Sequence, residues 1–217
     1  MDHGKRKLYL VRHAESVWNA ERRVQGTCTG ILLSERGREQ ARFLGKSLRA
    51  IEAAAVYCSD AERAVETARL ALGNGREIIF MEELRELSLG EWEGRSIVEL
   101  WEKETDLIDR WYREPTKVRV KGAEDIFSFR DRIVRAIETI GRAPHGGDSI
   151  IVTHGGVICA YLTHILGMDL DGLWSFSLPN ASITTIVLDF KPRLRSFGET
   201  VLPPGGASDS DGVSSSG

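Results

Sequence analysis

Two short apolar segments that each end in a histidine constrain the fold of this chain most strongly. The first covers residues 7–11 and leads into Arg12 and His13, and the second covers residues 149–153 and leads into His154. Apolar runs of this length are typical of buried strands. Small residues after both histidines allow the chain to turn sharply from strand into helix. The pattern therefore predicts two strands whose carboxyl ends each present a histidine.

Strand-like and helix-like patterns alternate along the rest of the chain. Apolar residues recur at helical spacing after Ser34, a candidate N-cap, and again in residues 126–140. Asp60 is the candidate cap of another helix, which Gly73 and Gly75 end. Further strands are expected at residues 54–58, 77–80 and 183–190. The alternation favours an α/β fold, a three-layer α/β/α sandwich around a mostly parallel central sheet.

Two parts of the chain depart from this alternation. Residues 95–121 hold three large aromatic residues among many charges, with Pro115 as a helix breaker, and we expect a short helical excursion over the site. From residue 203 onward the chain consists mainly of Pro, Gly, Ser and Asp, which cannot build a core. We therefore expect one domain over residues 1–202 and a disordered tail over residues 203–217.

Charge, hydropathy and cysteine content exclude several classes of protein. The net charge of −3 gives no indication of nucleic-acid binding. The first apolar run is too short for a signal peptide, and no segment approaches the roughly 18 apolar residues of a membrane span. We therefore expect a cytoplasmic protein without membrane contact. An odd number of cysteines without a Cys-x-x-Cys pair predicts free thiols at Cys28, Cys58 and Cys159.

The predicted strand ends suit phosphate chemistry. In open α/β sheets, ligands bind outside the carboxyl ends of the strands, where helix N-termini present free N–H groups to an anion. Positive charge beside His13 keeps its ring neutral, as a nucleophile requires. The forked guanidinium of Arg12 matches the oxygens of a phosphoryl group. Two unrelated histidines at strand ends are the alternative that these segments alone leave open.

Five motifs in a fixed order extend the pattern over most of the chain. They lie at residues 12–19, 34–41, 59–68, 84–94 and 153–156. A single motif such as Arg-His-Ala is a weak signal, but five in this order are specific. Together they resemble the histidine phosphatase superfamily, also called the phosphoglycerate mutase-like family, over nearly all of the chain except its tail.

The resemblance implies a role for each matching residue. His13 matches the family's phosphorylated histidine, and Glu86 matches the acid that protonates the leaving group and then helps to activate water. Arg12, Arg63 and His154 match its phosphate pocket. The resemblance also implies substrate contacts from Asn19, Gln25 and Gly155. The histidines and carboxylates form no convincing metal set, so we expect an enzyme that needs neither metal nor cofactor.

The identity of the acid has alternatives. Glu86, Glu91 and Glu93 all lie in the same motif. A carboxyl group beside a phosphate dianion has a raised pKa because the like charge disfavours ionisation, so it can donate a proton near neutral pH. Glu86 is favoured because it stands where the family places its acid.

Three functions are open at this point. The first is a phosphomonoesterase that hydrolyses small phosphorylated metabolites through a phosphohistidine. The second is a cofactor-dependent phosphoglycerate mutase, but residues 95–121 are short and mixed in charge, without the paired arginines with which family mutases hold a second phosphate. The third is a non-catalytic phosphate-ligand-binding or regulatory protein, which the presence of all five core residues disfavours. The sequence leaves the oligomeric state open, with a homodimer among the alternatives.

Overall fold

A six-stranded mixed sheet forms the centre of the fold in a computed structural model that describes residues 5–201. The strand order is β3-β2-β4-β1-β5-β6, in which neighbours among the first four run parallel, β5 runs antiparallel to β1, and β6 antiparallel to β5. The strands are β1 (Arg6–Arg12), β2 (Ala55–Cys58), β3 (Ile79–Phe80), β4 (Ser149–Thr153), β5 (Ser182–Leu188) and β6 (Pro192–Thr200). The sheet is mostly parallel, as the sequence predicts.

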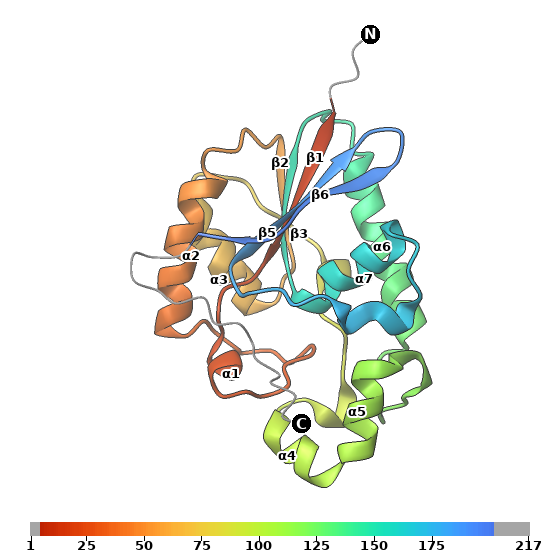
Figure 1. Cartoon of the computed structure of the whole chain (residues 1–217). Coiled ribbons are helices and arrows are strands. Elements are labelled where there is room, and N and C mark those ends of the chain that lie inside the picture. Colours follow the sequence, from red (N-terminus) through yellow and green to blue (C-terminus); the bar gives the residue numbers. More distant parts are fainter. Residues whose placement is uncertain (1–4, 202–217) are drawn as a thin grey trace.

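Helices cover both faces of this sheet, as Figure 1 shows. One face carries α2 (Glu35–Leu48) and α3 (Glu62–Leu72), and the other carries α6 (Ile126–Gly141) and α7 (Gly155–Ile165). The short α1 (Val17–Ala20) lies beyond the end of β1. The expected three-layer α/β/α sandwich is therefore confirmed.

Side-chain alternation along the strands explains the two cores. Leu10 of β1 belongs to the buried cluster that includes residues of α6 and α7, whereas Val11 belongs to the cluster that includes residues of α2 and α3. Successive side chains of a strand point to opposite faces of the sheet, so each inner strand supplies both cores. The sequence of such a strand is consequently a continuous apolar run.

Local sequence explains where the helices around the sheet begin and end. Ser34 accepts a hydrogen bond from a backbone N–H three residues later at 2.9 Å and begins α2, as predicted. Gly73, with φ of 80°, ends α3, also as predicted. The expectation that Asp60 caps α3 is wrong, since the N-cap is Ala61. Asp60 instead binds the guanidinium of Arg85, which offers two charge-assisted bonds in place of one bond to a backbone N–H.

The edges of the sheet differ from the sequence expectations. β3 contains two residues where the pattern at 77–80 predicts four, and the strand expected at 183–190 ends at Leu188. The sequence pattern does not predict β6, which pairs with β5 at the edge of the sheet. Its residues alternate between half-buried and exposed, because an edge strand of this kind contributes little to the core. Few apolar residues therefore mark it in the sequence.

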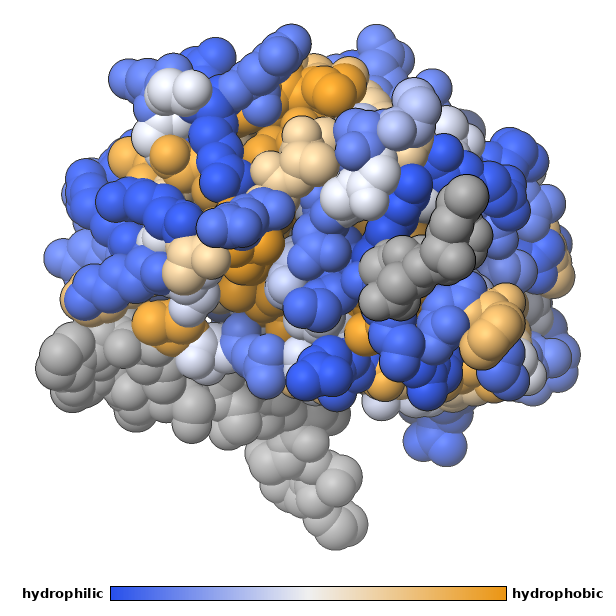
Figure 2. Space-filling model, turned by 90° about the horizontal axis from the view of Figure 1, so that it is seen from above, coloured by the Kyte–Doolittle hydropathy of each residue, from blue (hydrophilic) through white to orange (hydrophobic). Residues whose placement is uncertain are grey.

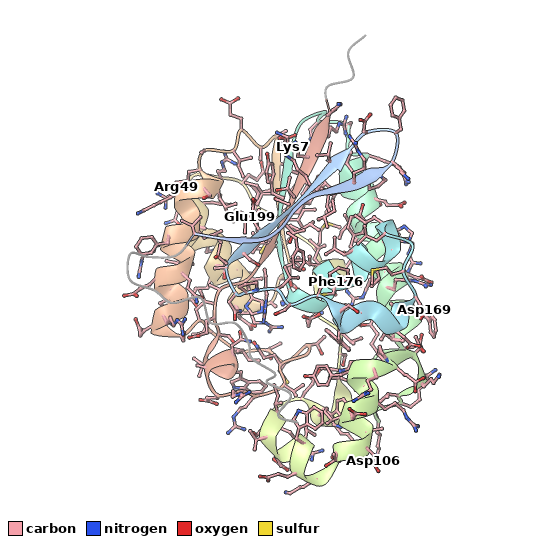
Figure 3. The ribbon with its side chains drawn as sticks, in the orientation of Figure 1. Lys7, Arg49, Asp106, Asp169, Phe176 and Glu199 are labelled. Carbon is pink, nitrogen blue, oxygen red and sulfur yellow. The ribbon has the colours of Figure 1, made fainter. Side chains whose placement is uncertain are left out.

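Residues 95–121 form the expected helical excursion. It contains α4 (Ile97–Lys103) and α5 (Thr105–Arg113). Both helices lie beyond the carboxyl ends of the parallel strands (Figure 1), with Asp106 at the far tip and Lys7 near the opposite end of the molecule (Figure 3). The short 3-10 helices are η1 (Glu82–Leu84), η2 (Gly90–Trp92), η3 (Pro115–Lys117) and η4 (Leu170–Ser175).

Aromatic side chains anchor the excursion to the core. Trp111 of α5 is 8% exposed and packs edge-to-face against the buried Trp92, with ring centroids 5.8 Å apart. Its ring also packs against that of Trp174 of η4, with ring centroids 5.7 Å apart. These contacts confirm that the aromatic residues of the excursion tie it to the domain.

The disordered tail expected at residues 203–217 lies outside the described residues. Within residues 5–201, no helix has the length and hydropathy needed to cross a membrane. Figure 2 views the end of the molecule where β1 begins and shows hydrophilic residues over most of that face, with apolar patches among them. This mixture is typical of protein surfaces.

Candidate active site

The two histidines predicted at strand ends lie together because their strands pair in register. Arg12 of β1 lies opposite Thr153 of β4, and the N–H of His13 donates to the Thr153 carbonyl at 2.9 Å. The ring centroids of His13 and His154 are 5.2 Å apart, and their planes meet at 65°. His13 is 4% exposed and His154 is fully buried. The parallel pairing therefore builds one buried histidine pair from residues 141 positions apart.

The hydrogen bonding of His13 fixes which ring nitrogen can act as a nucleophile. Nδ1 lies 2.7 Å from the carbonyl oxygen of Ala14. A carbonyl can only accept, so Nδ1 carries the proton and Nε2 keeps its lone pair. Burial, followed by the charges of Arg63 and Arg12, lowers the pKa of His13 well below 6.5, although the bond to Ala14 opposes this. The ring is thus neutral, with an unprotonated Nε2, at neutral pH.

Arg63 presents buried donors that suit an anion. It lies in the first turn of α3, is 1% exposed and donates from Nη2 to the Gly26 carbonyl at 2.8 Å. Its Nε and Nη1 are buried and make no hydrogen bond within residues 5–201. Buried donors are normally satisfied, and phosphoryl oxygens are matching acceptors. Arg12, whose Nη1 donates to the Leu178 carbonyl, lies close enough to His13 to influence its pKa.

Glycines after His154 make room for Glu86. One carboxylate oxygen of Glu86 accepts the N–H of Gly156 at 2.9 Å, at the N-terminus of α7. A Cβ on Gly156 would lie 2.4 Å from the other oxygen, so a side chain at this position would displace the Glu86 carboxylate. A Cβ on Gly155 would lie 3.4 Å from Nε of Arg12. The resemblance assigns Gly155 a substrate contact, which stays a prediction.

The structure separates Glu86 from the two other candidate acids. Glu91 is exposed. Burial would raise the pKa of Glu93, but hydrogen bonds from the backbone N–H groups of Thr27 and Leu89, each 2.9 Å long, outweigh it and the pKa is lowered. Glu93 therefore stays a carboxylate that joins two loops. Of the three glutamates, only Glu86 lines the cavity described next.

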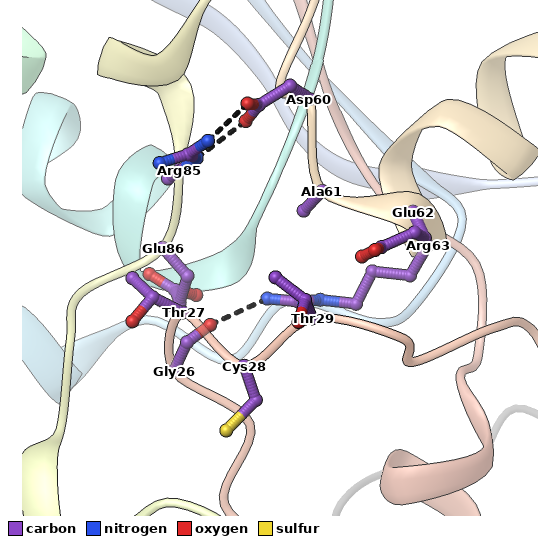
Figure 4. Close-up of a pocket in the computed structure, with 10 residues that line it drawn as sticks. All are labelled: Gly26, Thr27, Cys28, Thr29, Asp60, Ala61, Glu62, Arg63, Arg85 and Glu86. Atoms are coloured by element: carbon purple, nitrogen blue, oxygen red, sulfur yellow. Dashed lines mark hydrogen bonds and ion pairs between the residues drawn. The ribbon is translucent and has the colours of Figure 1, made fainter.

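A cavity of about 230 Å³ opens beside these groups, between residues 26–29, 60–63 and 85–86. Figure 4 shows the carboxylates of Glu62 and Glu86 on opposite sides of this space. Asp60 is engaged by Arg85, whose Nε donates to it at 2.7 Å. One oxygen of Glu62 is buried and has no hydrogen-bond partner among the described residues. The cavity thus offers unused donors on Arg63 and an unused acceptor on Glu62.

Cys28 also lines the cavity, but its environment disfavours a reactive thiolate. Burial and then the bond to Glu93 raise the pKa of Cys28 to about 11, so the thiol stays protonated at neutral pH. All three cysteines are free, as predicted.

Asn19 and Gln25 lie on a polar network around Ser16. The Ser16 hydroxyl donates to Gln25 at 2.7 Å, and the Ser16 backbone N–H donates to Asn19 at 3.1 Å. Neither residue is among those lining the cavity. Their contact with substrate stays a prediction.

Three polar residues that the sequence pattern does not single out lie beside the histidines. The Asn180 amide donates to the His13 carbonyl at 3.2 Å, Thr67 accepts the N–H of Ala14 at 3.0 Å, and Ser59 lies 2.8 Å from His154. Ser59 and Thr67 belong to the motif at 59–68, so the motif drew attention to their segment. Asn180 lies before β5, and nothing in the sequence marks it.

Lowering the pH below 6.5 is expected to destabilise the fold through the two buried histidines. Burial is the main reason that the pKa values of His13 and His154 are lowered in the folded protein. Between 6.5 and those lowered values the unfolded chain binds protons that the folded chain does not, so acid favours unfolding. The free energy of unfolding that the two histidines contribute is fully present above about pH 6.5. It falls as the pH drops towards their pKa values in the folded protein.

Urea unfolding near pH 7.5 and near pH 5.5, compared between the wild type and a His13→Gln variant, measures this effect. The wild type should lose more free energy of unfolding between the two pH values than the variant. An equal loss of free energy of unfolding in both proteins would contradict the lowered pKa of His13.

Comparisons with known proteins agree with this geometry. Residues 8–198 match the family model of the histidine phosphatase superfamily (branch 1). The chain is 34% identical to phosphoserine phosphatase 1 of Hydrogenobacter thermophilus, over 84% of this chain and 87% of that protein. It is 33% identical to the protein named probable phosphoglycerate mutase GpmB of Salmonella paratyphi C, over 83% of this chain and 84% of that protein.

A solved structure gives the same result. The chain is similar to YhfR of Bacillus stearothermophilus with a TM-score of 0.83 and 34% identity, over 89% of this chain and 97% of that one. The family match and the phosphatase-named relatives identify a phosphoric monoester hydrolase. The chain belongs to the histidine phosphatase superfamily.

Proposed function

We propose that this protein hydrolyses a small phosphomonoester through a phosphohistidine on His13. The observation that carries this proposal is the neutral His13 ring, whose Nδ1 is held by the Ala14 carbonyl at 2.7 Å and whose Nε2 is left to attack. A nucleophile that forms a covalent intermediate divides one difficult substitution into two easier steps. Arg12, Arg63 and His154 supply the positive charge and donors that stabilise the transferred group.

The two steps balance in protons and bonds. In the first, Nε2 of His13 bonds to phosphorus, the bond from phosphorus to the ester oxygen breaks, and Glu86 gives its proton to the departing alkoxide. In the second, water attacks the phosphohistidine, Glu86 takes a proton from that water, and the nitrogen–phosphorus bond breaks. Inorganic phosphate leaves and both residues return to their starting states.

The cavity supports a polar leaving group with hydrogen-bond donors. The buried oxygen of Glu62 lacks a partner among the described residues, and an ammonium or hydroxyl group would satisfy it. Arg85 also lines the cavity, but Asp60 already binds its guanidinium. Phosphoserine carries both an ammonium and a carboxylate group, and a relative at 34% identity is named phosphoserine phosphatase. We therefore place phosphoserine first among the candidate substrates.

A Glu62→Gln variant tests this assignment. It removes the charge that an ammonium group would pair with, so KM for phosphoserine should rise about tenfold, which corresponds to roughly 1.4 kcal/mol. Hydrolysis of p-nitrophenyl phosphate, which has no such group, should change little. The matched control is Glu83→Gln, at an exposed glutamate outside the cavity. Equal changes in KM for the two substrates would exclude the role of Glu62 in binding an ammonium group. They would not contradict the proposed phosphatase activity.

A phosphoglycerate mutase is the second candidate, because relatives at 33% identity are named probable phosphoglycerate mutase. A mutase must hold a second phosphate while its bisphosphate reorients, and that phosphate needs dedicated cations. In the excursion, Arg95 binds Glu104, Lys103 lies 3.2 Å from Glu99, and Arg113 lies 2.9 Å from Asp109. These acidic partners already neutralise the cations, which favours hydrolysis.

The assay that separates the two candidates follows 3-phosphoglycerate with and without 2,3-bisphosphoglycerate. A phosphatase releases inorganic phosphate from its substrates and shows no dependence on the bisphosphate. Rapid bisphosphate-dependent formation of 2-phosphoglycerate, with little free phosphate, would establish the mutase instead.

Exhaustive chelation is expected to leave the activity unchanged. Arg12 and Arg63 provide the charge that a divalent cation provides in other phosphatases. Within residues 5–201, no three histidine, cysteine or acidic side chains gather as metal ligands. Turnover after EDTA treatment and after readdition of single divalent ions measures the requirement. Loss of activity with recovery on one metal would refute the arginine-based scheme.

Two wider expectations also stay proposals. We place the protein in the cytoplasm because three free thiols suit a reducing compartment. We place one domain over residues 1–202. Cell fractionation and limited proteolysis, respectively, measure these two properties.

A further inference from the structure

Ser59 makes a hydrogen bond to the second histidine of the site. Its Oγ lies 2.8 Å from Nε2 of His154, and both residues are fully buried. The N–H of Ser59 donates to the Val152 carbonyl at 2.9 Å, which fixes Ser59 against β4 two residues before His154. The serine is therefore held by the same strand that positions the histidine.

The remaining contacts of Ser59 favour one direction of this bond. Its Oγ also accepts the N–H of Ala61 at 3.3 Å. The hydroxyl has one hydrogen to donate, and the acceptor that the described residues offer to it is Nε2 of His154. When the hydroxyl donates to Nε2, that nitrogen holds a lone pair and carries no proton.

The protonation of His154 then follows from its charge state. Burial, followed by the charges of Arg63, His13 and Arg12, lowers the pKa of His154 well below 6.5. A neutral imidazole has one protonated nitrogen, so a proton absent from Nε2 must be on Nδ1. Nδ1 is buried and has no hydrogen-bond partner among the described residues, like Nε and Nη1 of the neighbouring Arg63. These orphaned donors match an oxyanion.

We propose that Ser59 is a positioning residue that holds His154 in the Nδ1-protonated tautomer, so that Nδ1–H donates to the transferred phosphoryl group. The opposite tautomer would turn a lone pair towards the phosphoryl oxygens and repel them. His13 and His154 then share one tautomer but use opposite nitrogens. A carbonyl holds the Nδ1 proton of His13 and frees Nε2 to attack, whereas a hydroxyl occupies Nε2 of His154 and frees Nδ1–H to donate.

Nitrogen NMR of the histidine rings tests the proposal in the wild-type protein. The ring signals distinguish a protonated from an unprotonated nitrogen, and loss of signals in a His154→Asn variant assigns them. We expect a protonated Nδ1 and an unprotonated Nε2 at His154, and a shift of the Nδ1 signal on addition of inorganic phosphate. A protonated Nε2, or a phosphate-induced shift confined to Nε2, would overturn the proposal.

Variants of Ser59 provide the second readout. Ser59→Ala should mix the two tautomers and lower kcat/KM by about 10- to 100-fold, less than the 10²–10³-fold typical of deleting an oxyanion donor. Ser59→Thr keeps the hydroxyl and should retain the wild-type tautomer. The matched control is Ser149→Ala, which removes a buried hydroxyl of β4 that has no hydrogen-bond partner among the described residues. An unchanged tautomer in Ser59→Ala would contradict the proposal.

The proposal rests on the proposed role of His154 in holding phosphate, and the two can fail separately. The ring signals report the tautomer whether or not any ester is hydrolysed. Suppose that His154 is protonated at Nδ1 and that this signal shifts on phosphate addition, but the protein hydrolyses no phosphomonoester. That result would support the positioning role of Ser59 and overturn the proposed hydrolytic function. If Ser59→Ala does not fold, the wild-type spectrum still decides the question.

Discussion

Replacing His13 with alanine is expected to abolish the covalent intermediate and to lower kcat/KM at least about 100-fold. The lone pair on Nε2 is the attacking group, and alanine leaves nothing in its place. In the wild type, rapid quenching during turnover should trap an acid-labile, base-stable phosphoryl group that mass spectrometry locates on His13. A histidine that only activated water would form no such species.

The matched control is His145→Ala, which removes an exposed histidine whose neighbour is Tyr57 rather than the site. That variant should keep both the trapped phosphoryl group and the wild-type rate. A His13→Ala enzyme that retains more than roughly a hundredth of the wild-type rate would show that another group carries the nucleophilic role.

Replacing Glu86 with glutamine is expected to reduce turnover by about 10²- to 10⁴-fold for substrates with poor leaving groups. The amide preserves the shape and can still accept the N–H of Gly156, but it has no acidic proton to transfer. Phosphorylation by esters such as p-nitrophenyl phosphate should suffer much less, because p-nitrophenolate leaves without a proton. Single-turnover rates with alkyl and nitrophenyl esters measure this difference.

Glu91→Gln is the control for this experiment, since Glu91 lies in the same motif but is exposed. It should leave both rates near the wild-type values. Equal losses of the phosphorylation rate for good and poor leaving groups in Glu86→Gln would argue against proton donation by Glu86.

The catalytic strands were predictable because their physical causes are local. Buried parallel strands require continuous apolar runs, and the runs before His13 and His154 are short and clearly bounded. Parallel pairing then places both carboxyl ends at one edge of the sheet. Sequence periodicity and one topological rule therefore predict both histidines at one edge of the sheet, and the pairing of β1 with β4 brings them into contact.

Contacts between distant segments were not predictable in this way. Asp60 was expected to cap α3, but Arg85, 25 residues later, takes its carboxylate. Glu93 shares a motif with Glu86, but its bonds to Thr27 and Cys28 hold it against the 26–29 loop. Each of these side chains has several possible partners, and tertiary structure decides which one it meets. Periodicity carries no information about that choice.

The register between β1 and β4 has a consequence for how this protein can change. The spacing of the two histidines is set by backbone hydrogen bonds of the central strands, which single side-chain replacements leave in place. Arg63 and Glu86 also line the cavity, but the rest of its wall includes the connecting segment 26–29, where replacements cost the core little. Reactivity and selectivity are thus inherited through different parts of the chain. Replacements in this connecting segment can therefore change which phosphomonoester binds while the histidine pair keeps its geometry.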